Sequence, residues 1–280
     1  MEQAYHPDPL VKVRDLEVTY ITDNEDFRAV KKVSFDIGKS EIFGLAGESG
    51  CGKSTIAFAI NRLHKPPALI TNGEINYNGT NLLQLSEKEM GVIRWKEIAM
   101  VFQSAMNSLN PVLPLKEQFA DVMRHHLGCT NEEAYARAEK LLDLVNIPRE
   151  RLSEFPHQFS GGMRQRLVIA IALSLNPKLI IMDEPTTALD VVVQREILQQ
   201  IYQLRREFDF SVLFITHDLA LMSQLCDRIA VMRHGEIVEV NKAKEIRNNP
   251  QHPYTQQLWA SFPNIHEEAE HISVTEDISA

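Results

Sequence analysis

The chain has 280 residues, of which 44% are hydrophobic, and a formal net charge of −9 at pH 7. This length supports a substantial core, and the acidic balance excludes the basic surface that holds nucleic-acid phosphates, so we expect no nucleic-acid partner. The three cysteines, an odd number without paired spacing, argue against a disulfide framework or a structural zinc site.

The first residues lack the basic and then apolar profile of a signal peptide. No segment approaches the roughly 20 apolar residues of a membrane-spanning helix. We therefore expect a protein that is soluble by itself. Peripheral attachment to a membrane protein would use ordinary protein contacts, and the hydropathy pattern does not exclude it.

The amino-terminal part of the chain predicts antiparallel strands, because apolar and polar residues alternate from about residue 10 to residue 40 and again at 73–79. The segment 73–79 is bounded by glycines and is expected to be a short strand of its own. Two further runs are typical of strands buried on both faces: 41–46, which is apolar after its first residue, Glu41, and 98–102, which is apolar throughout.

Helical spacing dominates from residue 104 to residue 175. It is clearest in the segment 131–145, and this region predicts a mostly helical insert. Hydrophobic strands return at 179–183 and 211–216, with a helix at 194–208 between them, which is typical of a parallel α/β sheet.

The end of the chain is polar and acidic and has little to bury. We expect residues 266–280 to be disordered. The remaining residues 1–265 are expected to form a single domain, since no repeat or linker divides them.

A phosphate-binding motif follows the apolar run 41–46, and a helix is predicted directly after it, at 53–63. The motif has the form G-x-x-x-x-G-K-[ST], and its residues with the next threonine are Gly47, Glu48, Ser49, Gly50, Cys51, Gly52, Lys53, Ser54 and Thr55. Its backbone N–H groups would bind phosphate oxygens, Lys53 would reach the terminal phosphates, and Ser54 would ligate Mg²⁺. The alternative is a glycine-rich turn before a helix, but the flanking strand and helix favour a nucleoside triphosphate site.

Two adjacent carboxylates, Asp183 and Glu184, end the apolar strand 179–183. At the carboxyl end of a parallel strand they would meet the phosphate loop. Asp183 would then hold Mg²⁺ through its hydration shell, and Glu184 would orient and deprotonate the attacking water. Taken alone, the pair is also compatible with a solvated acidic turn.

His217 stands at the end of the next strand, 211–216, and would emerge at the same edge of the sheet, where it could contact the γ-phosphate. A lone histidine at a strand end is more often structural. The other histidines show no spacing typical of metal ligands, so we expect no metal site built from protein ligands alone.

A second helix start with anion-binding character lies at Ser160, Gly161 and Gly162, ahead of the apolar helix 167–175. One nucleotide cannot easily use two such loops more than a hundred residues apart in one chain. A head-to-tail dimer that shares its nucleotides explains both loops. The alternative is an ordinary serine N-cap.

The order of these motifs resembles that of the nucleotide-binding subunits of ABC transporters, from about Leu10 to Trp259. The resemblance implies a P-loop NTPase fold of class α/β, with a RecA-like core, an antiparallel β subdomain and a helical subdomain. It also implies ATP hydrolysis with Mg²⁺ held by Ser54, Gln103 and Asp183. Gln103 would also link the γ-phosphate to a transmembrane partner.

The same resemblance implies that one cassette contacts the ATP of the other through Ser160, Gly161, Gly162 and Asp190. The usual signature Leu-Ser-Gly-Gly-Gln is here Phe-Ser-Gly-Gly-Met, which keeps the serine and both glycines. Tyr20 is the expected aromatic partner of adenine, and Phe27 is the alternative.

Residues 98–103, 107–112, 159–166 and 249–255 resemble the oligopeptide, dipeptide and nickel importer branch in particular. That branch implies two transmembrane permease subunits, a second ATPase subunit and, indirectly, an extracytoplasmic solute-binding protein. It also implies a peripheral location on the cytoplasmic face of the inner membrane. Many members carry a cysteine cluster after the His-Pro-Tyr-Thr segment, but this chain has no cysteine beyond Cys226, so we expect no iron–sulfur cluster.

Oligopeptides or dipeptides are the expected cargo, and oligosaccharides and nickel are the alternatives within the branch. A soluble ABC ATPase outside transport is a remote alternative, because such proteins carry long coiled coils or two cassettes. A non-hydrolysing subunit would be expected to lack Glu184 or His217, and both are present.

Overall fold

The computed structural model describes residues 5–23, 25–103, 108–187 and 189–261, and its strands form two sheets. In the core sheet the order is β10-β9-β3-β8-β7-β6, and all neighbours are parallel except β10 and β9. Its strands are β3 (Ile42–Gly47), β6 (Ile98–Val101), β7 (Leu179–Asp183), β8 (Ser211–Thr216), β9 (Arg228–Arg233) and β10 (Glu236–Lys242). The expected disorder of residues 266–280 concerns residues outside the described ranges.

The second sheet is antiparallel and has the order β2-β1-β4-β5. Its strands are β1 (Pro9–Tyr20), β2 (Phe27–Gly38), β4 (Ala68–Tyr77) and β5 (Thr80–Asn81). This sheet packs against the core sheet through aromatic rings: Phe35 of β2 stacks on Phe43 of β3, with ring centroids 5.2 Å apart.

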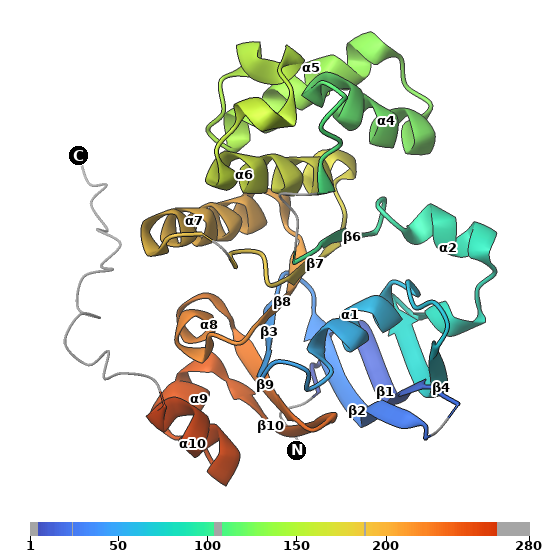
Figure 1. Ribbon diagram of the computed structural model, residues 1–280, viewed down its shortest axis with the longest axis vertical. Coiled ribbons are helices and arrows are strands. Elements are labelled where there is room, and N and C mark those ends of the chain that lie inside the picture. The colour runs from blue at the N-terminus through green and yellow to red at the C-terminus, as the bar shows by residue number, and fades with distance from the viewer. Residues whose placement is uncertain (1–4, 24, 104–107, 188, 262–280) are drawn as a thin grey trace.

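The helices cover both sheets and extend beyond them (Figure 1). The α-helices are α1 (Lys53–Ile60), α2 (Glu87–Ile93), α4 (Leu115–Leu127), α5 (Asn131–Leu144), α6 (Gly161–Ala172), α7 (Val191–Phe208), α8 (Leu219–Leu225), α9 (Ala243–Asn248) and α10 (Pro253–Ala260). Short 3₁₀ helices lie at η2 (Leu82–Gln84), η3 (Arg149–Ser153), η4 (Pro156–Gln158) and η5 (Leu173–Leu175). In Figure 1 the group α4, α5 and α6 lies at one end of the molecule, at the top of the view.

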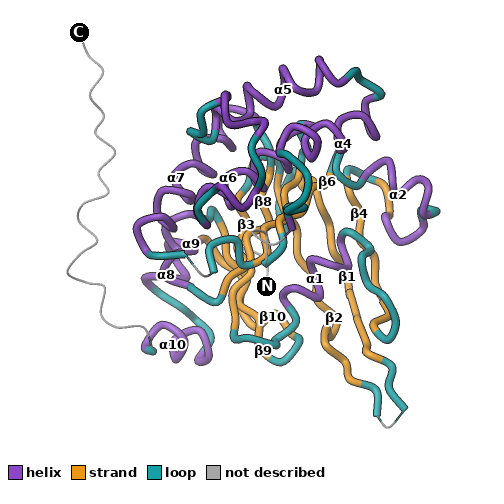
Figure 2. The backbone as a smooth tube through the Cα atoms, turned by 45° about the horizontal axis from the view of Figure 1, so that its top comes forward, coloured by secondary structure: helices purple, strands orange, loops and turns teal. Residues whose placement is uncertain are grey.

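Both faces of the core sheet are buried, which explains the uninterrupted apolar runs of its strands. Alternate residues of β8 belong to different hydrophobic clusters: Val212 and Phe214 pack with the helices α4 to α7, whereas Leu213 and Ile215 pack with α1 and the antiparallel sheet. Figure 2 shows β3 and β8 between these two groups of elements. The two clusters pack on opposite faces of the core sheet and hold its strands in place. The predicted site residues lie at the carboxyl ends of β3, β7 and β8.

The antiparallel strand expected at 73–79 is longer than its glycine boundary indicates, since β4 begins at Ala68. Gly73 lies inside the strand with a φ of 101°, at an irregularity in the register with β1. A Cβ at this position would lie 2.6 Å from the carbonyl oxygen of Arg14. The glycine therefore permits a close approach of two strands and does not end one.

Helix α7 begins at Val191, three residues before the start expected from the sequence. Asp190 provides the N-cap, because its Oδ1 accepts hydrogen bonds from the backbone N–H groups of Val192 (3.1 Å) and Val193 (3.0 Å). The run of β-branched valines obscured this start, since such residues favour strands when judged by propensity alone.

Candidate nucleotide-binding site

The phosphate loop connects β3 to α1 and has the strand and helix flanks that its motif requires. Its first glycine, Gly47, has a φ of 149°, and a Cβ there would lie 2.4 Å from the carbonyl oxygen of Met232. Gly52 has a φ of 107° just before α1. Glycine is needed at both positions because the loop is closely packed against neighbouring backbone.

Lys53 and Ser54 open α1 and point to different parts of the site. The Lys53 Nζ donates hydrogen bonds to the carbonyl oxygens of Gly47 (2.7 Å) and Glu48 (2.8 Å), so its charge lies over the loop. The Ser54 hydroxyl donates to Oδ1 of Asp183 at 3.1 Å. The loop of one strand and the carboxylate of another are thereby joined directly.

Asp183 is the last residue of β7, and only 3% of its surface is exposed. Burial raises the pKa of its carboxyl group, and the charge of Glu184 acts in the same direction, whereas Ser54 and Lys53 lower it. A buried carboxylate beside a hydroxyl gives the hard oxygen donors that Mg²⁺ prefers. Among the described residues, no group of three or more His, Cys, Asp and Glu could hold a metal ion.

Glu184 is held by three side chains that converge on its carboxylate. Its Oε1 lies 3.0 Å from Nδ1 of His217, and its Oε2 accepts hydrogen bonds from the hydroxyls of Thr187 (2.8 Å) and Thr216 (3.4 Å). Its backbone has a φ of 49°, which is sparsely populated for a residue other than glycine. The strand end therefore turns sharply, and the carboxylate has a fixed direction.

We call Lys53, Ser54, Asp183, Glu184 and His217 the phosphate-loop cluster. The structure brings all five together although 164 positions separate the first from the last (217 − 53). Parallel pairing of β3, β8 and β7 explains this, because it sets their carboxyl ends side by side.

A cavity of about 300 Å³ opens beside this cluster. It is lined by Tyr20, Phe27, Ala29, Ser49, Gly50, Gly52, Lys53, Ser54, Thr55, Gln103 and Glu184. Both candidate aromatic partners of adenine are in this lining, with ring centroids 6.4 Å apart. Phe27 is 60% exposed, whereas Tyr20 is half-buried.

Residues from the carboxyl-terminal part of the chain also pack beside the phosphate loop. Gly235, in the turn between β9 and β10, donates a hydrogen bond from its N–H to the carbonyl oxygen of Cys51 at 3.1 Å. Tyr254 of α10 is buried and lines a cavity of about 330 Å³ together with Glu48, and the Arg233 guanidinium lies 4.6 Å from its ring centroid. Burial raises the pKa of the Tyr254 phenol, and the nearby negative charge of Glu48 also contributes.

The remaining predicted residues, Ser160, Gly161, Gly162 and Asp190, form a separate group that we call the signature cluster. Among the described residues, the lining of the 300 Å³ cavity includes none of them. Ser160 caps α6 by accepting from the N–H of Met163 at 3.4 Å, and a Cβ on Gly162 would lie 2.5 Å from Cγ1 of Val193. The starts of α6 and α7 are thus packed together, with Ser160 and Asp190 exposed.

The sequence analysis missed residues with a clear place in the site, among them Thr187, Thr216 and Ala29. Thr187 donates to Glu184 from a turn three residues later, and Ala29 lines the cavity from β2. A hydroxyl at this short spacing after the carboxylates could have indicated Thr187. Ala29 has no functional group that could have revealed it.

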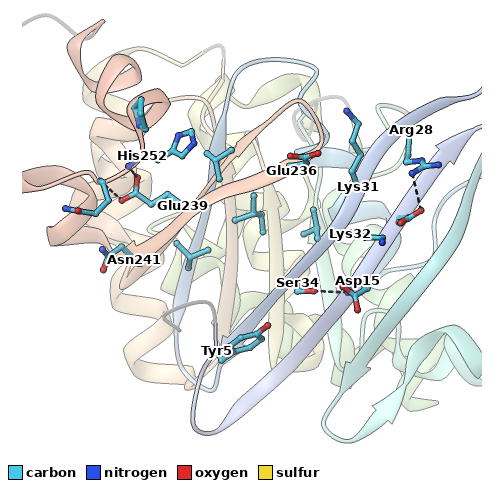
Figure 3. Close-up of a pocket in the computed structure, with 17 residues that line it drawn as sticks. Tyr5, Asp15, Arg28, Lys31, Lys32, Ser34, Glu236, Glu239, Asn241 and His252 are labelled. Carbon is cyan, nitrogen blue, oxygen red and sulfur yellow. Dashed lines mark hydrogen bonds and ion pairs between the residues drawn. The ribbon is translucent and has the colours of Figure 1, made fainter. Parts of the chain in front are cut away.

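A larger cavity, of about 1170 Å³, lies between β2 and β10 (Figure 3). It contains none of the predicted site residues, and charges of both signs line it. Several of its polar groups are paired, as with Arg28 and Glu17 (3.9 Å) or the Ser34 hydroxyl and the N–H of Asp15 (2.8 Å). We therefore assign the chemistry to the smaller cavity at the phosphate loop.

Comparison with known families gives two matches. The family model described as ABC transporter matches residues 30–187, and the model described as the C-terminal region of oligopeptide/dipeptide transporters matches residues 238–278. Within the part of the chain that the structure describes, none of the helices combines the length and the hydropathy of a membrane span.

Individual relatives agree with these matches. The oligopeptide transport ATP-binding protein OppD of Bacillus subtilis (strain 168) is 46% identical over 264 residues, covering 93% of this chain and 74% of that protein. The dipeptide transport ATP-binding protein DppD of the same organism is 44% identical over 259 residues, covering 91% and 77%.

A solved structure has the same fold. The dimeric post-hydrolysis state of the ATP-binding cassette MJ0796, bound to ADP and Pi, superimposes with a TM-score of 0.74 and 31% identity, covering 83% of this chain and 98% of that one. The expected α/β fold of a P-loop NTPase is confirmed. With its phosphate-loop cluster and these relatives, the chain belongs to the ABC transporter family, as an ATP-hydrolysing cassette.

Proposed function

We propose that this chain is the ATP-hydrolysing subunit of a membrane importer for oligopeptides or dipeptides. The observation that carries the hydrolytic part is the convergence of Ser54, Asp183, Glu184 and His217 at one edge of the core sheet. The names of the relatives, which are oligopeptide and dipeptide transport proteins, support the choice of cargo.

In this proposal the phosphate loop from Gly47 to Thr55 binds the phosphates of ATP. Lys53 exchanges its hydrogen bonds to the carbonyls of Gly47 and Glu48 for phosphate oxygens, which are charged and therefore stronger acceptors. Ser54, Asp183 and Gln103 would hold Mg²⁺, with Asp183 acting through the hydration shell of the ion. When bound, Mg²⁺ neutralises charge that develops on the phosphate oxygens.

Glu184 is the general base in this mechanism, because its carboxylate is fixed and lies in the lining of the cavity. It orients the attacking water and accepts its proton. His217 holds the carboxylate through the contact at 3.0 Å and can contact the γ-phosphate from the same edge. Tyr20 stacks on the adenine, as the more enclosed of the two rings.

The signature cluster acts on a nucleotide bound by a second ATPase subunit, identical or homologous. Its residues lie away from the cavity of their own chain, and Ser160 and Asp190 are exposed. Residues 1–265 form one domain in this proposal, since strands of the core sheet contribute to both hydrophobic clusters. In the complex this chain lies at the cytoplasmic face of the inner membrane, attached to two transmembrane permease subunits. The complex receives cargo from an extracytoplasmic solute-binding protein and includes no nucleic acid.

The test is to purify the membrane complex through this subunit and to identify its companions by mass spectrometry. Two multi-span proteins and a solute-binding protein are expected. Peptides, oligosaccharides and nickel are then compared as ligands of that binding protein. Recovery of ribosomes, DNA-associated proteins or no membrane protein would contradict the transport proposal.

A further inference from the structure

The signature segment Phe159–Met163 differs from the usual sequence of the family at its first and last residues. Both of these residues contact the same side chain, Arg151 of η3. The guanidinium carbon lies 4.1 Å from the centroid of the Phe159 ring, and Nη1 lies 3.6 Å from Sδ of Met163. Arg151 therefore contacts the residue just before Ser160 and the residue that follows Gly162.

The chemistry of these contacts depends on the two replaced residues. A planar guanidinium is attracted to the face of an aromatic ring, and a thioether sulfur is a weak hydrogen-bond acceptor. The leucine of the usual signature has no aromatic face. Phe159 is also buried, so its ring is fixed and presents one face to Arg151.

The guanidinium itself is fixed by other partners. Glu154 accepts its hydrogen bonds through both carboxylate oxygens, at 2.7 to 3.1 Å, and the carbonyl oxygen of Gln158 accepts another at 3.0 Å. The carbonyl oxygen of Glu154 in turn accepts from the N–H of Leu115, the first residue of α4, at 2.9 Å. Arg151 thus connects the signature segment, through Glu154, to the start of α4.

We propose that Arg151 is a positioning residue that fixes both ends of the signature segment, so that Ser160 is presented to a nucleotide on a second subunit. The functional part of this inference rests on the proposed function, since Ser160 is assigned there to the partner's ATP. The anchoring part rests only on the contacts within this chain.

The anchoring is tested by hydrogen–deuterium exchange of the full chain, followed in peptides that cover residues 158–166. Arg151→Ala is expected to exchange about tenfold faster in this segment, because the stacking and hydrogen bonds that hold it closed are lost. Arg151→Lys, which keeps the charge without the planar fork, is expected to be intermediate. The matched control is Arg149→Ala, since the Arg149 side chain is 56% exposed and pairs with Asp143.

A second background isolates the two unusual residues. In Phe159→Leu/Met163→Leu, the further change Arg151→Ala is expected to alter exchange by a smaller factor than in the native chain. The Phe159 ring and the Met163 sulfur are already absent there, and within the segment only the hydrogen bond to the carbonyl oxygen of Gln158 is left to lose. The double variant Phe159→Leu/Met163→Leu, which keeps Arg151, must itself exchange faster than the native chain. This comparison tests the proposal even where Arg151→Ala does not fold. Equal exchange in the native and Arg151→Ala chains, or equal increments in both backgrounds, would overturn the proposal.

ATP turnover tests whether this anchoring of the signature segment matters for hydrolysis. Arg151→Ala is expected to lower ATPase activity roughly tenfold or more, as a small displacement of a positioning group can, and to leave the chain's own affinity for a fluorescent ATP analogue unchanged. If Arg151→Ala hydrolyses ATP as fast as the native chain, Arg151 has no role in positioning Ser160 for hydrolysis. A native chain that hydrolyses no ATP, but whose exchange responds to Arg151, would contradict the proposed function and leave the anchoring in place.

Discussion

The phosphate-loop cluster and the signature cluster are built differently within one chain. In the first, the carboxyl ends of neighbouring parallel strands bring Asp183, Glu184 and His217 together. Glu184 contacts His217, and Asp183 accepts a hydrogen bond from Ser54 of the phosphate loop. In the second, Ser160 and Asp190 start two helices and bond to the backbone that follows them. One chain therefore gathers Glu184 and the phosphate loop around its own cavity, whereas the exposed Ser160 and Asp190 of the signature cluster lie outside the lining of that cavity.

Glu184→Gln gives the largest expected effect and tests the first cluster. An amide keeps the size and one oxygen but cannot accept the proton of water, so ATPase activity should fall by about 10²- to 10⁴-fold. ATP affinity, measured with a fluorescent analogue, should stay near native and a closed dimer should accumulate. Lys53→Ala is the contrasting control, because it should lose affinity. Normal hydrolysis by Glu184→Gln would break the assignment.

Ser160→Asp tests the outward role of the second cluster. Aspartate caps a helix as well as serine does, so the fold and the chain's own ATP affinity should be unchanged. Its negative charge would face the phosphates of the partner's nucleotide, and turnover should fall by roughly 100-fold, since like charges brought together cost several kcal/mol. Unchanged turnover would mean that Ser160 is an ordinary N-cap.

Two alanine substitutions identify the aromatic ring that contacts adenine beside the first cluster. Tyr20→Ala should weaken ATP binding about fivefold, which corresponds to the loss of one stacked aromatic contact. Phe27→Ala should change it less, because the Phe27 ring is largely exposed. Isothermal titration of both variants with ATP decides between them, and a larger loss in the Phe27 variant would reverse the assignment.

Asp183→Asn gives the smallest expected effect and concerns stability. Because burial raises the pKa of Asp183 in the folded chain, the ionised carboxylate disfavours folding at neutral pH. This penalty is complete above the raised pKa and disappears as the pH falls through it towards the unfolded value near 4. Without Mg²⁺ and ATP, the asparagine variant should therefore unfold at a higher temperature than the native chain at pH 7.

The same series of thermal unfolding measurements supplies the control. The difference between Asp183→Asn and the native chain should shrink on acidification, and saturating Mg²⁺ and ATP should stabilise the native chain more than the variant. A lower unfolding temperature for the variant at pH 7 would contradict the role of burial.

The sequence predicted those features that depend on local pattern. The flanks of the phosphate loop, the buried strands 179–183 and 211–216 and the helix at 131–145 follow from periodicity, because burial on one or both faces imposes it. The convergence of Asp183, Glu184 and His217 also follows, once the strands are taken as parallel and adjacent.

Features that depend on contacts between distant segments could not be predicted in this way. The close approach that requires Gly73 inside β4 depends on the path of β1, and the early start of α7 depends on one capping carboxylate. The contacts of Arg151 with Phe159 and Met163 require the fold of the helical group. None of these leaves a periodic pattern in the sequence.

The burial of Tyr254 beside Glu48 has a consequence for how the chain can be divided. The two family models end and begin at residues 187 and 238, and these limits suggest separable modules. Yet Tyr254 and the turn at Gly235 support the phosphate loop, which belongs to the first match. The carboxyl-terminal region and the phosphate loop are therefore structurally coupled. An exchange of this region between relatives would also replace Tyr254, which packs beside the phosphate loop.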